Sequence, residues 1–126
     1  MGMISKKAVG TAKGSILFIH GVSHGDWCWD EYFLDFFAQN GFDAHAIDLR
    51  RHDKPGRQKG MHELGLKEYL EDIRNAVEEI GEDVILVGHS MGGLLVQKYL
   101  EKTSARAAIL LAPVPPTGVI GSAART

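Results

Sequence analysis

The 126-residue sequence has little of what marks several functional classes. Its single cysteine, Cys28, cannot form an internal disulfide or a cysteine-rich zinc site, which favours a reducing compartment such as the cytoplasm. The 14 Lys and Arg residues are balanced by 16 Asp and Glu, so no basic excess points to nucleic acid or to an anionic membrane surface. No apolar run approaches the roughly 18 residues of a membrane span, and we expect no signal peptide. The glycine motifs of phosphate-binding loops are also absent, which counts against a Rossmann-like nucleotide binder.

What the sequence does contain is a regular alternation of apolar segments. Short runs rich in β formers, apolar on both faces, are typical of buried strands, and they occupy residues 15–20, 42–49, 84–87 and 107–112. Between them, apolar residues recur at helical spacing within residues 29–37, 66–80 and 94–100. The aromatic residues of the first of these segments are expected to form one wide helical face. Strands alternating with helices predict an α/β fold, a parallel sheet with flanking helices.

The length predicts a single domain over residues 1–126. Within it, residues 1–14 are interpreted as a leading segment and 15–112 as the core. Residues 113–126, which are small and rich in Pro and Gly, are interpreted as a poorly ordered tail.

The strongest signal for chemistry is the sequence Gly88-His89-Ser90-Met91-Gly92, between a predicted strand and a predicted helix. On so tight a turn the serine takes a strained backbone conformation, and the two glycines lack the Cβ atoms that would clash. The turn would present Ser90 Oγ above the carboxyl ends of the strands, beside a helix N-terminus that stabilises negative charge. The pattern predicts a nucleophile elbow. The alternative is a glycine-rich turn that happens to contain a serine.

A second signal is the loop HGVSHGDWCW, residues 20–29, directly after the first buried strand. In a parallel sheet this loop opens on the same edge as Ser90, because both follow strand carboxyl ends. The backbone N–H of Val22 is then placed to join that of Met91 in an oxyanion hole. A loop packed simply by Trp27 and Trp29 is the alternative, and the two interpretations are compatible.

In this order and spacing, HGVSHGDWCW, AIDLRRHDKPG, GHSMGG and LLAPVPPTG resemble the N-terminal half of the α/β-hydrolase superfamily, from about residue 15 to 118. The first loop is similar to that of esterase-like members, including plant-type methyl esterases and hydroxynitrile lyases. The resemblance implies that strand 15–20 lies between strands 42–49 and 84–87. Strand 107–112 would come next to 84–87, at an edge of a truncated α/β-hydrolase fold.

The same resemblance implies a serine hydrolase that acts on carboxylic esters without cofactor or metal. Ser90 would be the nucleophile, and the Val22 and Met91 backbone N–H groups would be the oxyanion-hole donors. His24 and Trp27 would lie near the substrate pocket. The implied partner is a small acyl or ester substrate, with no nucleic acid and no membrane. Strand 107–112, left open at the edge, would also favour self-association.

The chain departs from the family pattern in its triad, which runs Ser, then Asp or Glu, then His. After Ser90 the sequence has a single acid, Glu101, and no histidine. All six histidines precede the nucleophile: His20, His24, His45, His52, His62 and His89. His20 is interpreted as a structural anchor of its loop, and His24 is the one that could face Ser90. We therefore expect the chain alone to be inactive; the alternative function is a non-catalytic pseudo-hydrolase that binds a small acyl compound or a partner chain.

Overall fold

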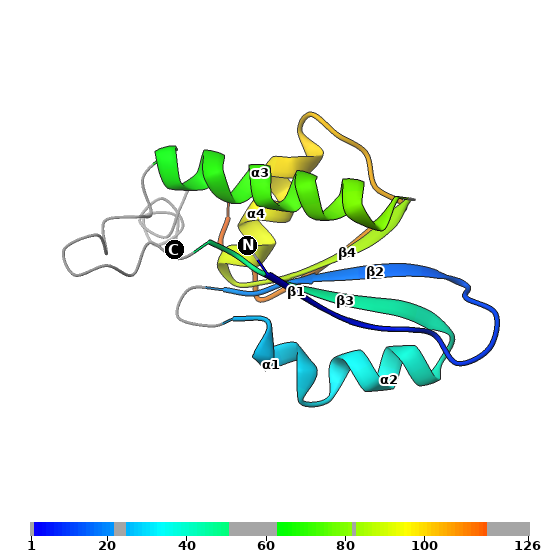
Figure 1. Ribbon diagram of the computed structural model, residues 1–126. Helices are drawn as coiled ribbons and strands as arrows, with labels where there is room; N and C mark the ends of the chain where they lie inside the picture. The colour runs from blue at the N-terminus through cyan, green and yellow to red at the C-terminus, as the bar shows by residue number, and fades with distance from the viewer. Residues whose placement is uncertain (1, 22–24, 51–62, 82, 116–126) are drawn as a thin grey trace.

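The computed structural model describes residues 2–21, 25–50, 63–81 and 83–115, which form a five-stranded sheet covered by helices (Figure 1). The strands are β1 Gly2–Lys6, β2 Gly14–Ile19, β3 Phe42–Asp48, β4 Val84–His89 and β5 Ala107–Leu111. The helices are α1 Trp27–Asp30, α2 Phe33–Gln39, α3 Glu63–Ile80 and α4 Met91–Leu100. The strand order is β1-β3-β2-β4-β5, so the predicted positions of β2 between β3 and β4, and of β5 at the edge, are confirmed.

The sheet is mixed rather than purely parallel, because β1 pairs antiparallel with β3. This strand falls in residues 1–14, which the sequence had suggested were only a leading segment. Met3 packs against the core on one face of the sheet and Ile4 against the core on the other. With only two apolar residues in five, the pattern is too short to predict a strand, so the pairing with β3 is what makes residues 2–6 a strand.

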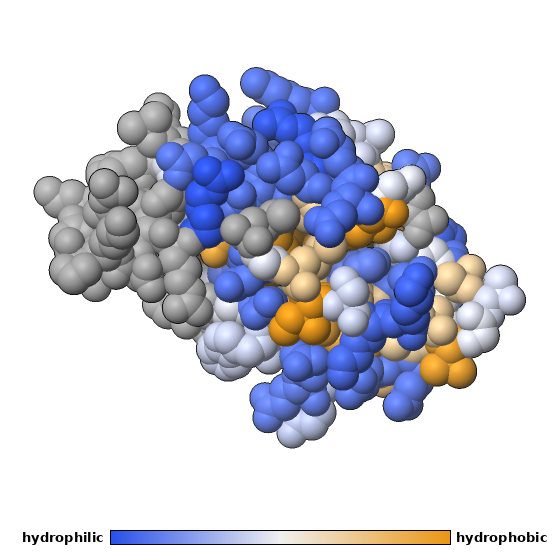
Figure 2. All heavy atoms as spheres, viewed as in Figure 1, coloured by the Kyte–Doolittle hydropathy of each residue, from blue (hydrophilic) through white to orange (hydrophobic). Residues whose placement is uncertain are grey.

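Helices cover both faces of the sheet, α3 and α4 on one side and α1 and α2 on the other (Figure 1). Successive residues of a strand point to opposite faces. Accordingly Leu17 and Ile19 of β2 join the core under α3 and α4, whereas Ile16 and Phe18 join the core under α1 and α2. The outer surface over α3 is hydrophilic (Figure 2), as expected of a helix with a single apolar stripe. In the described residues, no helix combines the length and apolarity that crossing a membrane requires.

The aromatic segment does not form the one continuous helical face that its spacing predicts. The helix is interrupted at Glu31 and Tyr32, where the backbone of Tyr32 leaves the helical region with φ −137°. The interruption separates α1 from α2, and the residues of α2 that are buried are Leu34 and Ala38. The side chains of Tyr32 and Phe36 are 72% and 58% exposed. The prediction was wrong because it assumed one continuous helix, whereas the break changes which residues meet the sheet.

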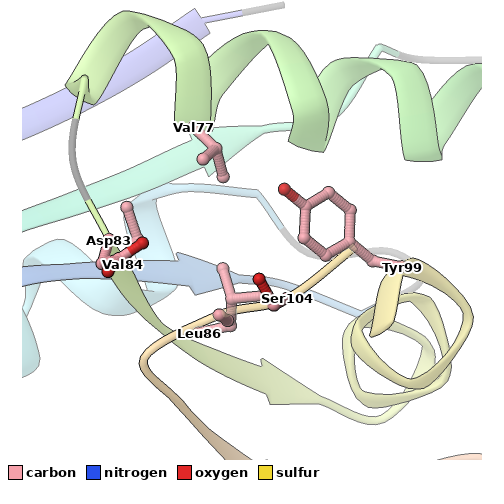
Figure 3. Close-up of a pocket in the computed structure, with 7 residues that line it drawn as sticks. Val77, Asp83, Val84, Leu86, Tyr99 and Ser104 are labelled. Carbon is pink, nitrogen blue, oxygen red and sulfur yellow. The ribbon is translucent and has the colours of Figure 1, made fainter. Parts of the chain in front are cut away.

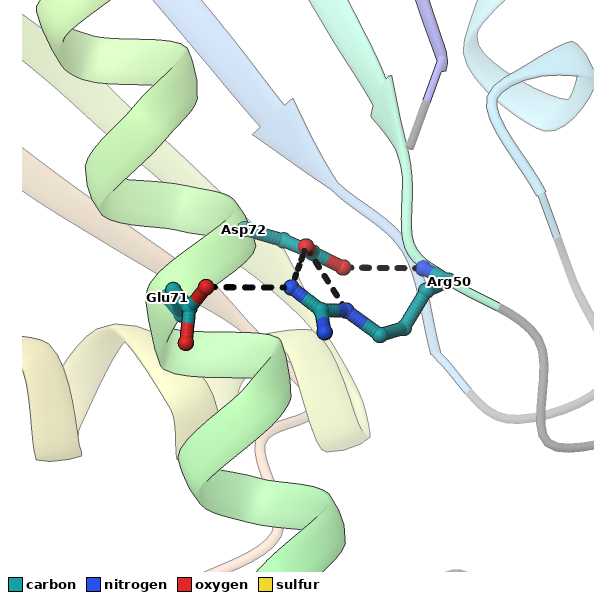
Figure 4. A network of polar contacts seen from close by, with 3 residues as sticks. All are labelled: Arg50, Glu71 and Asp72. Atoms are coloured by element: carbon teal, nitrogen blue, oxygen red, sulfur yellow. Dashed lines mark hydrogen bonds and ion pairs between the residues drawn. The ribbon is translucent and has the colours of Figure 1, made fainter.

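A buried carboxylate ties the segment after β3 to helix α3 (Figure 4). Asp72 Oδ1 accepts hydrogen bonds from Nε and Nη2 of Arg50 at 2.9 and 2.7 Å, and its Oδ2 accepts the Arg50 backbone N–H at 2.9 Å. Glu71, more exposed, lies 3.6 Å from the same guanidinium. Such a forked, charge-assisted contact is geometrically specific. It fixes the carboxyl end of β3 relative to α3, at the edge of the sheet where Ser90 also lies.

Candidate active site

Ser90 occupies the turn between β4 and α4 in a conformation that few side chains adopt. Its backbone angles are φ 56° and ψ −118°. A positive φ is uncommon for residues other than glycine, and strain of this kind concentrates at functional sites. Serine sits here between the last residue of a parallel strand and the first residue of a helix. Its side chain is therefore presented at the carboxyl edge of the sheet, and Ser90 is half-buried.

The turn requires glycine on both sides of Ser90 because backbones approach each other there. A Cβ atom on Gly88 would collide with the backbone of Gly92 and lie 2.7 Å from the nitrogen of Gly93. One on Gly92 would collide with the carbonyl of Ile19 and lie 2.8 Å from that of His20. Because these contacts are to backbone atoms, no side-chain movement relieves them. The glycine spacing predicted from the sequence therefore has a tertiary reason: α4 packs directly on β2.

His20 anchors the end of β2 and is not placed as a base. Its ring is buried, and its Nε2 accepts the backbone N–H of Leu49 at 3.1 Å. Nδ1 must then carry the proton, which it donates to the carbonyl of Gly21 at 2.8 Å. Nε2 thus links the end of β2 to the residue after β3, Nδ1 is held by the neighbouring carbonyl of its own loop, and the structural role predicted for this histidine is confirmed.

The first loop meets Ser90 through Gly21. A Cβ atom on Gly21 would lie 3.0 Å from Ser90 Cβ and 3.5 Å from its Oγ. The chain leaving β2 therefore passes directly beside the serine, as expected of two neighbouring strand ends. Val22 and His24, the predicted oxyanion donor and pocket residue on this loop, lie outside the described residues.

The remaining predicted site residues lie at different depths around this turn. Met91 is buried as the first residue of α4. Trp27 begins α1 and is 57% exposed; a Cβ atom on Gly25 would lie 3.0 Å from its ring. His89 packs edge-on against Trp29, with ring centroids 6.5 Å apart, which places its ring on the α1 and α2 side of the sheet. The structure thus brings Gly21, Ser90 and Met91 together.

The groups beside the first loop are acidic. Burial raises the pKa of the Asp26 carboxyl above its ordinary value, and the negative charge of Asp48 raises it further. Asp48 Oδ1 lies 3.7 Å from His20 Nε2. Burial also raises the pKa of the Cys28 thiol, so this cysteine is not an activated nucleophile. Within the described ranges, no three His, Cys, Asp or Glu side chains gather as metal ligands would.

A cavity lies at the other end of β4, away from Ser90 (Figure 3). It is bounded by residues of α3, α4, β4 and the segment that leads to β5: Val77, Asp83, Val84, Leu86, Tyr99, Ser104 and Ala105. Its volume is about 30 Å³, room for water but not for an ester substrate. Tyr99 turns its hydroxyl group into this space, and burial raises the pKa of that hydroxyl.

Comparison with known proteins relates this arrangement to one family. The sequence model of the "Alpha/beta hydrolase family" matches residues 16–126. Methylesterase 10 of Arabidopsis thaliana is 37% identical over 92 residues, covering 68% of this chain and 31% of the relative. The probable esterase PIR7A of Oryza sativa is 36% identical over 106 residues, 79% of this chain and 39% of the relative. The chain therefore spans about a third to two fifths of the length of these curated relatives.

Solved structures show the same fold at lower sequence identity. A bromoperoxidase from Bacillus anthracis superimposes with a TM-score of 0.70 at 24% identity, covering 90% of this chain and 40% of that one. An esterase from Exiguobacterium antarcticum superimposes with a TM-score of 0.71 at 21% identity, covering 90% and 41%.

Proposed function

The chain belongs to the alpha/beta hydrolase family, and from that premise we propose that it carries the nucleophile-bearing part of a serine hydrolase for small carboxylic esters. The observation that carries the proposal is the strained backbone of Ser90 at a strand-to-helix turn flanked by Gly88 and Gly92. A glycine-rich turn with only a structural role would not need a serine at the position of positive φ. The esterases among the sequence relatives support an ester as the substrate.

In the proposed chemistry, Ser90 Oγ forms a bond to the carbonyl carbon of the ester, the bond to the alcohol oxygen breaks, and the serine proton passes to that oxygen, so that the alcohol leaves. Water then cleaves the acyl-serine bond, which releases the carboxylic acid and returns the proton to Ser90. The oxyanion of the intermediate would accept hydrogen bonds from the Met91 and Val22 backbone N–H groups, next to the positive end of the α4 dipole. His24 and Trp27 would border the acyl or alcohol portion. The reaction needs neither metal nor cofactor, because Ser90 and backbone donors supply the nucleophile and the charge stabilisation.

The first test is covalent labelling of Ser90 with a fluorophosphonate, read by intact mass. We expect one adduct per chain, located on the peptide that contains Ser90 and absent from Ser90→Ala. Labelling should be slow, because no histidine follows Ser90 in the sequence and a serine without a base is a poor nucleophile near pH 7. Ser104→Ala, which changes an exposed serine at the far end of β4, is the matched control and should label like the parent chain.

An adduct that persists in Ser90→Ala would contradict the assignment of the nucleophile. A folded chain that forms no adduct at all would favour the second candidate function, a non-catalytic module that binds an acyl compound. The observation that favours this function is that His20, which follows β2, and His89, which precedes Ser90 in the chain, are both held in other contacts.

We also propose that two copies of the chain associate through the open edge of β5. All five residues of the strand, Ala107–Leu111, are exposed and uncharged. In an antiparallel pair centred on Ile109, each Ala107 would face a Leu111 and each Ala108 a Leu110, so that small side chains meet large ones. An unprotected apolar edge of this kind is a template for strand pairing.

The nearest charge does not block this pairing, because Arg106 turns back to donate Nη1 to the Lys13 carbonyl at 2.9 Å. We expect light scattering at tens of micromolar to show dimers or larger species, and Ile109→Lys to shift them to monomer. Val9→Lys places the same charge at an exposed apolar position far from β5 and should leave the association unchanged. A parent chain that is monomeric at this concentration would contradict the proposal.

A further inference from the structure

The end of β5 and the residues that follow it hold both backbone polar groups of Ser90. The Ser90 N–H donates to the Leu111 carbonyl at 3.0 Å, and the Val114 N–H donates to the Ser90 carbonyl at 3.1 Å. Between them, Ala112 has a φ of 44°, in the left-handed region that few residues other than glycine adopt. The Ser90 carbonyl also accepts N–H groups from the first turn of α4, as at any helix start. The two bonds to residues 111–114 are additional to these, and they bracket the strained residue.

Gln97 of α4 holds the same segment from its other side. Its Nε2 donates to the Val114 carbonyl at 3.3 Å and to the Gly93 carbonyl at 3.2 Å. Val114 is therefore fixed at both of its backbone groups, by Ser90 through the N–H and by Gln97 through the C=O. The close approach depends on Gly93, since a Cβ atom there would lie 2.6 Å from Pro113 Cβ. A polar side chain in the otherwise apolar stretch GLLVQ was the one sequence signal for this contact.

We propose that Gln97 is a positioning residue that acts through Val114 to hold Ser90 in its positive-φ conformation. The inference rests on the proposed function, since it concerns how the nucleophile is presented. A strained backbone persists only where the surrounding structure over-determines it. With Gln97 removed, Val114 loses one of its two anchors, and Ser90 gains access to relaxed conformations in which Oγ no longer points to the substrate.

The decisive measurement separates the maximal rate of fluorophosphonate labelling from the affinity for the probe. Gln97→Met keeps the length of the side chain but has no donor. We expect it to lower the maximal rate about three- to tenfold, the value of one or two neutral hydrogen bonds, with probe affinity unchanged. Lys98→Met, on the same helix but paired only with Glu101 in the described contacts, should label at the parent rate. Labelling of Gln97→Met at the parent rate, or an equal loss in Lys98→Met, would overturn the proposal.

Hydrogen exchange at the Val114 amide tests the clamp independently of serine reactivity. We expect exchange to be at least several-fold faster in Gln97→Met than in the parent chain or in Lys98→Met. Unchanged exchange would overturn the clamp whether or not Ser90 reacts. Faster exchange in a protein whose Ser90 never labels would instead contradict the proposed function and leave the clamp standing.

A second variant tests the same contact in case Gln97→Met does not fold. Val114→Pro removes the N–H that donates to Ser90 while leaving α4 intact, and its fold is checked by circular dichroism. It should lower the maximal labelling rate by a similar factor, again without a change in probe affinity. A folded Val114→Pro chain that labels at the parent rate would overturn the proposal.

Discussion

Purified residues 1–126 should show almost no multiple turnover of activated esters such as p-nitrophenyl acetate. In the mechanism that we propose, the proton of Ser90 needs an acceptor, and no histidine follows Ser90 in the sequence. The ring nitrogens of His20 are engaged with Leu49 and Gly21. An oxyanion hole and binding alone supply at most about 10³–10⁴-fold over water. Release of nitrophenol, measured in a continuous assay against Ser90→Ala, checks the expectation.

Imidazole as an added base sharpens this experiment. If the missing acceptor limits the rate, imidazole should accelerate acylation of the parent chain beyond its effect on Ser90→Ala, which corrects for direct hydrolysis by imidazole. Steady turnover without imidazole that disappears in Ser90→Ala would contradict the prediction. His24→Ala then becomes the variant to test, since loss of the rate with the fold intact would identify His24 as the base.

Replacing Gly92 by alanine should destabilise the fold by about 3 kcal/mol or more, enough to unfold a marginal domain. The added Cβ would meet the carbonyls of Ile19 and His20, which belong to the central strand β2 and the residue after it. Backbone of a central strand cannot move without breaking its pairing with both neighbouring strands. The free energy of unfolding from urea titration measures the loss directly.

Gly10→Ala is the matched control for this substitution. Gly10 has a φ of +80° but has no atom within 4 Å of the position that a Cβ would occupy. It should cost only the backbone strain of a left-handed alanine, about 1–2 kcal/mol. Gly92 is a helical residue without a positive φ, so only the contact with β2 penalises its Cβ atom. A loss in Gly92→Ala no larger than in Gly10→Ala would therefore contradict the close approach of α4 to β2 as the reason for glycine at residue 92.

The sequence predicted those parts of the molecule whose cause is local. The runs that became β2 and β4 are continuous stretches of apolar, β-forming residues. Such a stretch indicates a buried strand whatever the rest of the chain contains. The turn at Ser90 was also predictable, because a tight strand-to-helix connection demands glycine at set offsets and the pattern is five residues long. The strand order followed from the family resemblance.

The parts that were missed depend on partners distant in the chain. β1 is a strand because β3 offers it an edge, and the apolar content of residues 2–6 alone does not predict it. The helix break at Tyr32 changed which aromatic side chains are buried, and the helical spacing of the apolar residues gives no sign of such a break.

Within the site, the sequence by itself indicated that Ser90 stands on a strained glycine-flanked turn, because the glycine pattern of such a turn lies within five consecutive residues. Only the tertiary structure decided what holds it there. Val114 and Gln97 lie 24 and 7 residues from Ser90, and their hydrogen bonds exist because β5 ends beside β4. Likewise the tautomer of His20 is set by Leu49, the residue that follows the neighbouring strand β3. The groups that Gln97 and His20 bind are backbone groups, which every residue carries, so the sequence does not show which of them will be the partner until the sheet has assembled.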